Sequence, residues 1–367
     1  MKEEKYTCDI CHEERDLSEL TYFDESYLCE DCLRRETFIC RDCGDRHWND
    51  DSADGDLCQT CYDEDYVRCE RCDAVIHYDD ACYHEDEEYH DHPYCRDCFD
   101  MDEIIHDYYY KPEPIFYGDG PRYLGVELEL DDGGENEFCA SKLLEIANNG
   151  CERMYIKHDG SLDDGFECVT HPMTLDYHIN QMPWRAILNK AVAKGYLSHQ
   201  AGTCGLHVHI SRNALGANYE EQEATIAKIL YFYEKFWNEI LTFSRRTESQ
   251  VEHWARRYGG GIINPKETLK HAKNSHMGRY AAVNLENEAT IEMRIFRGTL
   301  KYNTFIATLQ MVDEICKVAI SLSDEFMQGL TWLDFVKGIA DGKQELINYL
   351  KEKRLYVNEP IRNEVEI

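Results

Sequence analysis

Three short segments in the later part of the chain alternate apolar side chains with acidic or imidazole groups. They are "YLGVELEL" (123–130), "GLHVHIS" (205–211) and "ATIEMRIFRGTL" (289–300). Because successive side chains of a β-strand point to opposite faces, each segment would gather its chemical groups on one face. The groups gathered in this way are Glu127 and Glu129, His207 and His209, and Glu292 and Arg294.

A fourth segment, "HDGSLDDGFECVTHP" (158–172), adds Asp159 and Glu167, eight positions apart across a glycine-rich turn. One such segment alone is equally explained as a half-buried strand with a solvated polar face. Four together favour a binding site, because several carboxylates on one sheet surface repel each other unless cations lie among them. Oxygen-rich sites with an imidazole suit Mg²⁺ or Mn²⁺ better than zinc. A divalent metal ion together with arginine side chains is the combination that binds the phosphates of ATP.

Twelve of the 18 cysteines form six C-x2-C pairs before residue 99. Taken two pairs at a time they make three modules, with 17, 14 and 22 residues between the pairs and seven residues between modules. The predicted ligand sets are Cys8, Cys11, Cys29 and Cys32; Cys40, Cys43, Cys58 and Cys61; and Cys69, Cys72, Cys95 and Cys98.

This spacing predicts three structural zinc ions, each held by four thiolates. Modules this small cannot bury a sufficient core, so the metal would supply the folding energy. A disulfide framework would need an oxidising compartment, and thioredoxin-like chemistry expects a single C-x-x-C. In the third module a ligand could instead come from Cys82, His84, His90 or His92. The modules are similar to zinc ribbons or treble clefs.

The formal net charge of −33 is concentrated in the region of the modules. Residues 1–110 contain 35 acidic and 10 basic side chains, a charge that disfavours nucleic acid and favours a protein or peptide partner. The first thirty residues carry no apolar run typical of a signal peptide, and no segment approaches about 20 apolar residues. We expect a cytoplasmic, soluble protein without membrane contact.

The patterns predict three regions: the zinc modules (1–100), a linker rich in Pro, Gly and Tyr (101–121), and a second domain (122–367). The second domain is expected to be α+β, with a largely antiparallel sheet and helices. Apolar periodicity predicts one long helix over 217–246, another over 302–323, and shorter helices near 332–339 and 343–353. The cysteines at 139, 151, 168, 204 and 316 are interpreted as small core residues.

Five motifs in fixed order carry a resemblance to a known family: "GVELEL", "DGSL…GFECVTHP", "CGLHVHIS", "RYAAVNL" and "TIEMRIFRGTL". They resemble the glutamine synthetase superfamily of carboxylate–amine ligases, and more closely its compact amidoligases of bacteria and phages, some of which are joined to zinc-binding modules. The resemblance covers roughly residues 115–325. It implies a glutamine synthetase-like sheet in the second domain.

The resemblance implies a role for each motif residue. Glu127, His207 and Glu292 would hold a first metal ion; Glu129, with Asp159 and Glu167, would hold a second. His209 would lie near the nucleotide and Arg294 would contact phosphate. Further phosphate-binding candidates are Arg256, Arg257, Arg279 and Arg297, each of which could equally be a surface ion-pair residue. Asn284 would orient a ligand or cap a turn.

The activity implied is ATP- and Mg²⁺-dependent (or Mn²⁺-dependent) formation of an amide from a small carboxylate and an amine, through an acyl phosphate. The chain departs from glutamine synthetase because the zinc modules stand where the usual N-terminal domain would be. Two alternatives remain open. One is a zinc-dependent interaction protein whose second domain is inactive or only binds a ligand. The other is phosphate transfer without amide formation.

Overall fold

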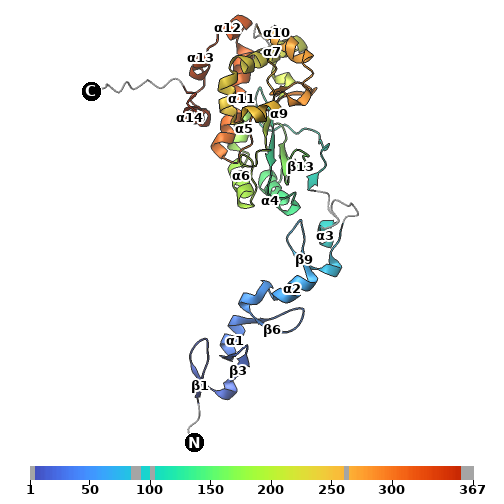
Figure 1. The fold of residues 1–367 in the computed structure, drawn as a ribbon, viewed down its shortest axis with the longest axis vertical. Coiled ribbons are helices and arrows are strands. Elements are labelled where there is room, and N and C mark those ends of the chain that lie inside the picture. Colours follow the sequence, from blue (N-terminus) through green and yellow to red (C-terminus); the bar gives the residue numbers. More distant parts are fainter. Residues whose placement is uncertain (1–4, 84–91, 100–103, 260–263, 357–367) are drawn as a thin grey trace, which may run out of the picture. The chain divides into compact units, whose positions relative to one another are not determined.

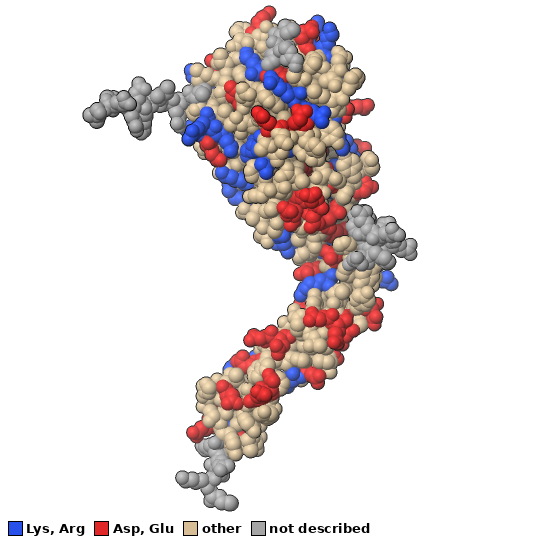
Figure 2. All heavy atoms as spheres, viewed as in Figure 1, with Lys and Arg blue, Asp and Glu red and all other residues tan. Residues whose placement is uncertain are grey.

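The computed structural model describes residues 5–83, 92–99, 104–259 and 264–356. The chain divides into two units, Met1–Asp102 and Glu103–Ile367 (Figure 1). Two of the alternative zinc ligands, His84 and His90, lie outside the described residues. In Figure 2 acidic side chains are spread over the first unit, whereas basic side chains gather mainly on the second.

The first unit repeats one small design, in which a C-x2-C turn joins two strands and a second C-x2-C pair starts a short helix. The first module contains β1 (Lys5–Thr7), β2 (Glu14–Asp16), η1 (Leu17–Glu19), β3 (Leu20–Phe23), β4 (Ser26–Cys29) and α1 (Glu30–Glu36). The second contains β5 (Thr37–Ile39), β6 (Arg46–Trp48), η2 (Asn49–Asp51), β7 (Ser52–Asp54), β8 (Leu57–Cys58) and α2 (Gln59–Asp65). The third contains β9 (Tyr66–Arg68), β10 (Val75–His77), η3 (Tyr78–Asp80) and α3 (Arg96–Phe99).

Consecutive modules are joined without a linker. Helix α1 ends at Glu36 and β5 begins at Thr37; α2 ends at Asp65 and β9 begins at Tyr66. The constant seven-residue spacing between modules is therefore the rest of one helix plus the first strand of the next module.

The second unit is built on a seven-stranded sheet with the order β11-β13-β14-β12-β15-β17-β16. Its strands are β11 (Ile105–His106), β12 (Leu124–Leu130), β13 (Met154–Lys157), β14 (Phe166–Thr170), β15 (Leu206–Ser211), β16 (Val283–Asn284) and β17 (Thr290–Met293). Every pairing is antiparallel except that of β11 with β13. The predicted α+β fold with a largely antiparallel sheet is confirmed.

Helices supply most of the remaining structure of this unit. They are α4 (Glu137–Asn148), α5 (Leu175–Asn180), α6 (Trp184–Ala193), η4 (Arg212–Ala214), α7 (Tyr219–Lys235), α8 (Trp237–Ser244), α9 (Glu248–Trp254), α10 (Pro265–Asn274), η5 (Gly278–Tyr280), α11 (Tyr302–Ser321), α12 (Asp324–Gly329), α13 (Trp332–Lys337) and α14 (Gln344–Glu352). The apolar side chains of β12 and β15 form one core with α4, α6, α7 and α11. This core leaves the polar side chains of the same strands on the opposite face.

The predicted helix over 217–246 is wrong as one continuous element. The structure has two helices, α7 and α8, separated at Phe236, whose backbone leaves the helical region (φ −107°, ψ 34°). Phe236 is nevertheless buried, with its ring centroid 4.8 Å from that of Phe232 and 5.5 Å from that of Trp332. Apolar periodicity reports the buried face and is insensitive to such a break. Among the described helices, none combines the length and apolar character needed to cross a membrane.

Residues 103–121, most of the segment predicted to be a linker, lie within the second unit. Ile105 and His106 form the edge strand β11, and Tyr108 and Tyr109 line the cavity described below. This segment therefore contributes to the sheet and to the candidate site.

Candidate metal and ligand-binding site

Each module of the first unit brings its four predicted cysteines together. In all three, one ligand atom from each residue lies within 4.8 Å of the others. The remaining alternative ligands of the third module that the structure describes, Cys82 and His92, are not part of this cluster. Four sulfurs at tetrahedral spacing with no open position fit structural zinc.

Backbone geometry favours the thiolate form of the first cysteine of each module. The amide of Cys29 donates to the sulfur of Cys8 at 3.3 Å, and that of Cys58 to Cys40 at 3.4 Å. Burial opposes ionisation, but these and neighbouring backbone N–H groups outweigh it and lower the pKa of both Cys8 and Cys40 to about 6. Thiolate is the form that binds metal, so the fold prepares these positions for zinc.

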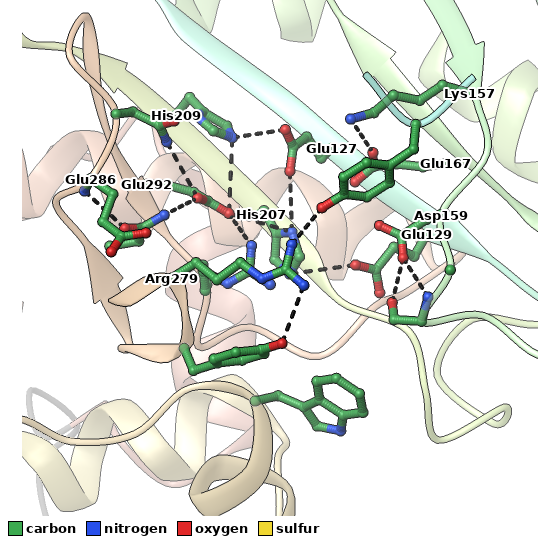
Figure 3. A pocket seen from close by; sticks show the side chains of 18 of the residues that line it. Glu127, Glu129, Lys157, Asp159, Glu167, His207, His209, Arg279, Glu286 and Glu292 are labelled. Atoms are coloured by element: carbon green, nitrogen blue, oxygen red, sulfur yellow. Dashed lines mark hydrogen bonds and ion pairs between the residues drawn. The ribbon is translucent and has the colours of Figure 1, made fainter. Parts of the chain in front are cut away.

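In the second unit, strand register aligns the predicted acidic and imidazole groups across neighbouring strands. Glu127 on β12 lies opposite His207 on β15, and His209 lies opposite Glu292 on β17. On the other side of β12, Glu129 faces Glu167 of β14. Antiparallel pairing places such partners on the same face, and all of these residues converge in Figure 3.

Glu127, His207 and Glu292 form a first cluster, with one ligand atom from each within 4.8 Å of the others. The Nδ1 atom of His207 is 3.3 Å from Glu127 and 3.6 Å from Glu292. His209 lies beside this cluster, with Nε2 3.0 Å from Glu127 and Nδ1 3.2 Å from the hydroxyl of Thr290.

Glu129, Glu167 and the same His207 form a second cluster. The Nε2 atom of His207 is 3.6 Å from Glu129, while Lys157 lies 3.1 Å from Glu167. All three cluster residues are buried. His207 thus stands between the two clusters and belongs to both.

The charges in these clusters are unequally balanced. Burial disfavours ionisation of Glu127, but His209 and His207 hold its pKa well below the usual value. Glu167 shows the opposite result: burial and the charge of Glu127 raise its pKa well above the usual value, despite Lys157. Burial, with a further contribution from the charge of Asp159, also raises the pKa of Glu129. The positive charge around the second cluster therefore does not balance its two carboxylates.

The donor chemistry of the two clusters fits hard divalent cations. Carboxylate oxygens with one imidazole are ligands of Mg²⁺ or Mn²⁺, and an added cation would relieve the repulsion in the second cluster. In such a position a divalent ion neutralises phosphate oxygens and polarises them.

A cavity of about 800 Å³ opens over both clusters. This size is suited to a nucleotide-sized ligand. Besides the cluster residues, the cavity is lined by the basic side chains Lys111, Lys157, Arg246, Arg279 and Arg294 and by the aromatic side chains Tyr108, Tyr109, Trp254 and Tyr280.

Three of the remaining predicted residues are held by hydrogen bonds in this cavity. Asn284 donates to Glu292 at 2.8 Å, and Arg294 contacts the same carboxylate at 2.5 Å. Arg279 donates to the hydroxyl groups of Tyr108 and Tyr280. These contacts orient Glu292 and connect Arg279 to the aromatic part of the lining.

Asp159 also lines the cavity but lies outside the second cluster. Its carboxylate accepts from the amide and hydroxyl of Ser161 at 2.7 and 2.6 Å. The pair of residues eight positions apart is therefore split: Glu167 joins Glu129, whereas Asp159 holds the turn beside them.

The other candidate arginines lie outside the cavity lining. Arg257 pairs with the buried Glu234 at 2.7 Å, and Arg256 lies 3.9 Å from Glu252 on the surface of α9. The amide of Arg297 donates to the carbonyl of Ser244, and its charge acts on His199 together with those of Arg245 and Lys353.

Three basic residues of the cavity lining were not predicted from the sequence: Lys111, Lys157 and Arg246. Arg246 is 6% exposed; its Nε donates to the carbonyl of Ile295 at 3.2 Å, and its Nη1 has no hydrogen-bond partner among the described residues. Burial, opposed by Glu129, lowers its pKa to about 10. Lys157 could have been found from its place in "MYIKHDG", two positions before Asp159. Arg246 ends a helix-like segment and carries no comparable signal.

The backbone at Gly205 allows this close approach. A Cβ there would lie 2.4 Å from Nε2 of His207 and 3.0 Å from a guanidinium nitrogen of Arg246. The amide of Gly205 donates to Glu129. Glycine is therefore required for the imidazole and the arginine to meet beside Glu129.

Residues 145–316, a little under half of the chain, match the model of a family described as "putative amidoligase enzyme". The match includes β14, β15 and β17, while β12, with Glu127 and Glu129, precedes it. The search of curated proteins finds no match. The resemblance carried by the sequence motifs is thereby confirmed, and the second unit is similar to the amidoligases, a family of ligase-type enzymes.

Proposed function

We propose that the protein is an ATP- and Mg²⁺-dependent carboxylate–amine ligase. The observation that carries the proposal is the pair of clusters sharing His207 beneath one cavity, with cationic side chains around them. Two divalent ions there would neutralise the phosphate oxygens of ATP. Mn²⁺ would fit the same donors.

The reaction would proceed in two balanced steps. A carboxylate oxygen of the acid attacks the terminal phosphorus of ATP, the bond to ADP breaks, and an acyl phosphate forms. The amine nitrogen then attacks the acyl carbon, the carbon–oxygen bond to phosphate breaks, and the amine loses a proton. Arg294 and Arg246 would offset the charge that develops on phosphate and carboxylate oxygens. His209, Asn284 and Arg279 would position the nucleotide and Glu292.

ATP binding to the full chain gives the first test. Calorimetry with Mg²⁺ should detect binding that is lost in Glu127→Ala and Glu292→Ala, with Glu286→Ala as a control at the cavity wall outside both clusters. Hydroxylamine as a surrogate amine, with a panel of small acids, should then give hydroxamate and ADP in equal amounts. Equal release of ADP and phosphate without hydroxamate for every acid would contradict ligation, and a phosphorylated acid would indicate the phosphotransfer alternative.

We further propose that the zinc modules recruit the protein or peptide that provides a substrate group. Support comes from the acidic surface of the first unit and from its exposed apolar residues, including Tyr22 and Tyr27, whose ring centroids lie 5.0 Å apart. An acidic face with aromatic groups fits a basic peptide. Removing residues 1–102 should lower the rate with basic peptide acceptors while leaving the hydroxylamine rate unchanged. Equal loss of both rates would contradict recruitment.

A further inference from the structure

A second basic group lies in the second unit, outside the lining of the cavity. It contains Arg245 after α8, Arg297 after β17, Lys353 after α14 and His199 in the segment before β15. These residues come from four separate parts of the sequence. None of the four lines the cavity that contains Arg246 and Arg294.

The contacts of Arg245 and Lys353 meet at Tyr349. Arg245 donates to the Tyr349 hydroxyl at 3.4 Å, and its guanidinium carbon lies 6.0 Å from the ring centroid. The ammonium nitrogen of Lys353 is 5.4 Å from the same centroid. Arg245 also donates to the carbonyl of Arg297. Two cationic side chains therefore lie against one aromatic ring, and Arg245 connects them to the backbone of Arg297.

The pKa of His199 is affected by the positive charge of the other three residues. Burial, together with Arg297, Arg245 and Lys353, lowers the pKa of His199. Burial also lowers the pKa of Arg245, with Arg297 adding to the effect. The imidazole therefore stays neutral while the other three residues are cationic.

Three nitrogens in this group lack hydrogen-bond partners within the described part of the chain. They are Nε of Arg245, Nε of Arg297 and Nδ1 of His199, all of them buried. Buried polar atoms without partners are costly and uncommon, and an ion or water that completes them is a usual explanation. The nearby carboxylate of Glu352 lies 3.2 Å from Lys301, and both side chains are more than half exposed. That pair does little to neutralise the half-buried arginines.

We propose that Arg245, Arg297, Lys353 and His199 form a binding site for a small phosphate- or carboxylate-bearing anion, separate from the cavity. Guanidinium groups bind such oxygens through paired N–H donors, and a lysine adds a mobile charge. An anion there would neutralise three cations for which the described residues provide no matching buried acid.

Gly205 connects this site to the cavity. Gly205 forms a backbone bridge with Arg297, and its amide donates to Glu129 of the second cluster. An anion that orders Arg297 would thereby fix the backbone that holds Glu129. The inference does not depend on the ligase activity, because the anion site stands on its own contacts.

The test uses inorganic phosphate and the full, zinc-loaded chain with histidine labelled for NMR. The His199 signal is assigned by its loss in His199→Gln. Phosphate should raise the pKa of His199 by about one unit relative to sodium chloride of equal ionic strength, because a neighbouring anion favours the imidazolium. A citrate titration then asks whether carboxylates occupy the same site.

Lys353→Gln and Arg297→Gln should each raise the half-saturating phosphate concentration about tenfold, as measured by the His199 signal. Each substitution removes a charge-assisted contact to the anion. Arg256→Gln is the matched control, because Arg256 is an exposed arginine paired with Glu252. Lys353 is at the end of a helix, so its substitution keeps the test valid if Arg297→Gln fails to fold. An equal pKa change in chloride and phosphate, or unaltered binding in Lys353→Gln, would overturn the proposal.

Discussion

Glu129 and Glu167 lie directly opposite each other on β12 and β14, as a cross-strand pair of buried carboxylates. Like charges in this position destabilise a sheet, and burial raises the pKa of both residues. Two positions earlier on β12, Glu127 faces His207 and contacts His209 at 3.0 Å, which lowers its pKa. Strand β12 thus carries Glu129, which is repelled by a neighbouring carboxylate, and Glu127, which is attracted by neighbouring imidazoles.

This contrast predicts opposite effects of two matched substitutions. Without divalent cations other than zinc, Glu129→Gln should raise the free energy of unfolding by up to about 1 kcal/mol, because one of two opposed charges is removed. Glutamine can still accept from Gly205. Glu127→Gln should lower the stability, because it removes the partner of His209. Thermal unfolding of both variants after removal of Mg²⁺ checks the signs.

Adding Mg²⁺ should then stabilise the parent protein more than Glu129→Gln, since binding to the native state raises stability. The same sign of change in both variants without Mg²⁺ would contradict the charge assignment.

Arg246 is expected to act on the reacting groups rather than on nucleotide affinity. Arg246→Gln should leave ATP affinity within about twofold and lower hydroxamate turnover by about 10²–10³-fold, the range for losing one buried donor to a developing charge. Arg246→Lys should restore part of the turnover. Calorimetry and the hydroxamate assay separate the two effects, with Arg256→Gln as a control. A large loss of ATP affinity with unchanged turnover would place Arg246 on the nucleotide instead.

Zinc content should change in whole steps. The parent chain is expected to hold three ions, and Cys32→Ser should hold two, because each module has its own four sulfurs. Cys82→Ser is the control: Cys82 belongs to the third module but lies outside its cluster, so three ions should remain. Elemental analysis of purified protein gives the stoichiometry. Loss of an ion in Cys82→Ser would show that the third site uses a different ligand set.

His178 should make stability depend on pH. It is fully buried, its Nε2 donates to the Leu124 carbonyl at 3.0 Å, and its Nδ1 accepts from Trp184 at 3.2 Å. Burial lowers its pKa to about 4, from 6.5. The unfolded chain therefore takes up a proton first, and stability is lost as pH falls from 6.5 to 4, by roughly 3 kcal/mol at most.

In His178→Gln this part of the pH dependence should disappear, so the difference in stability between parent and variant should shrink as pH falls. Chemical denaturation at several pH values measures it. A constant difference between pH 7 and pH 4 would contradict a neutral buried imidazole.

The sequence predicted those parts of the sites whose residues are set by short, regular spacing along the chain. Six C-x2-C pairs predicted the three clusters, because a metal site needs its ligands at fixed short intervals. Alternation on β12, β15 and β17 placed Glu127, His207 and Glu292 on one face, and antiparallel register then brought them together.

What escaped prediction depends on tertiary contacts. Arg246 reaches the site only because Gly205 lacks a side chain, and Asp159 leaves the cluster because Ser161 binds its carboxylate. At the break between α7 and α8, Phe236 packs against Trp332, a residue 96 positions later. Residues 101–121 were predicted to be a linker because Pro, Gly and Tyr are frequent there. The pairing of β11 with β13 and of Tyr117 with Met173 depends on tertiary contacts that composition does not show.

The two nitrogens of His207 have a consequence for how the clusters divide their ligands. Nδ1 faces Glu127 and Glu292, and Nε2 faces Glu129. A neutral imidazole has one lone pair and one N–H, so it can coordinate at only one end and must donate a proton at the other. The two positions are therefore chemically unequal: one receives a nitrogen ligand, while the other is left with oxygen ligands alone. Exchange of the imidazole tautomer would reverse that inequality without moving a single strand.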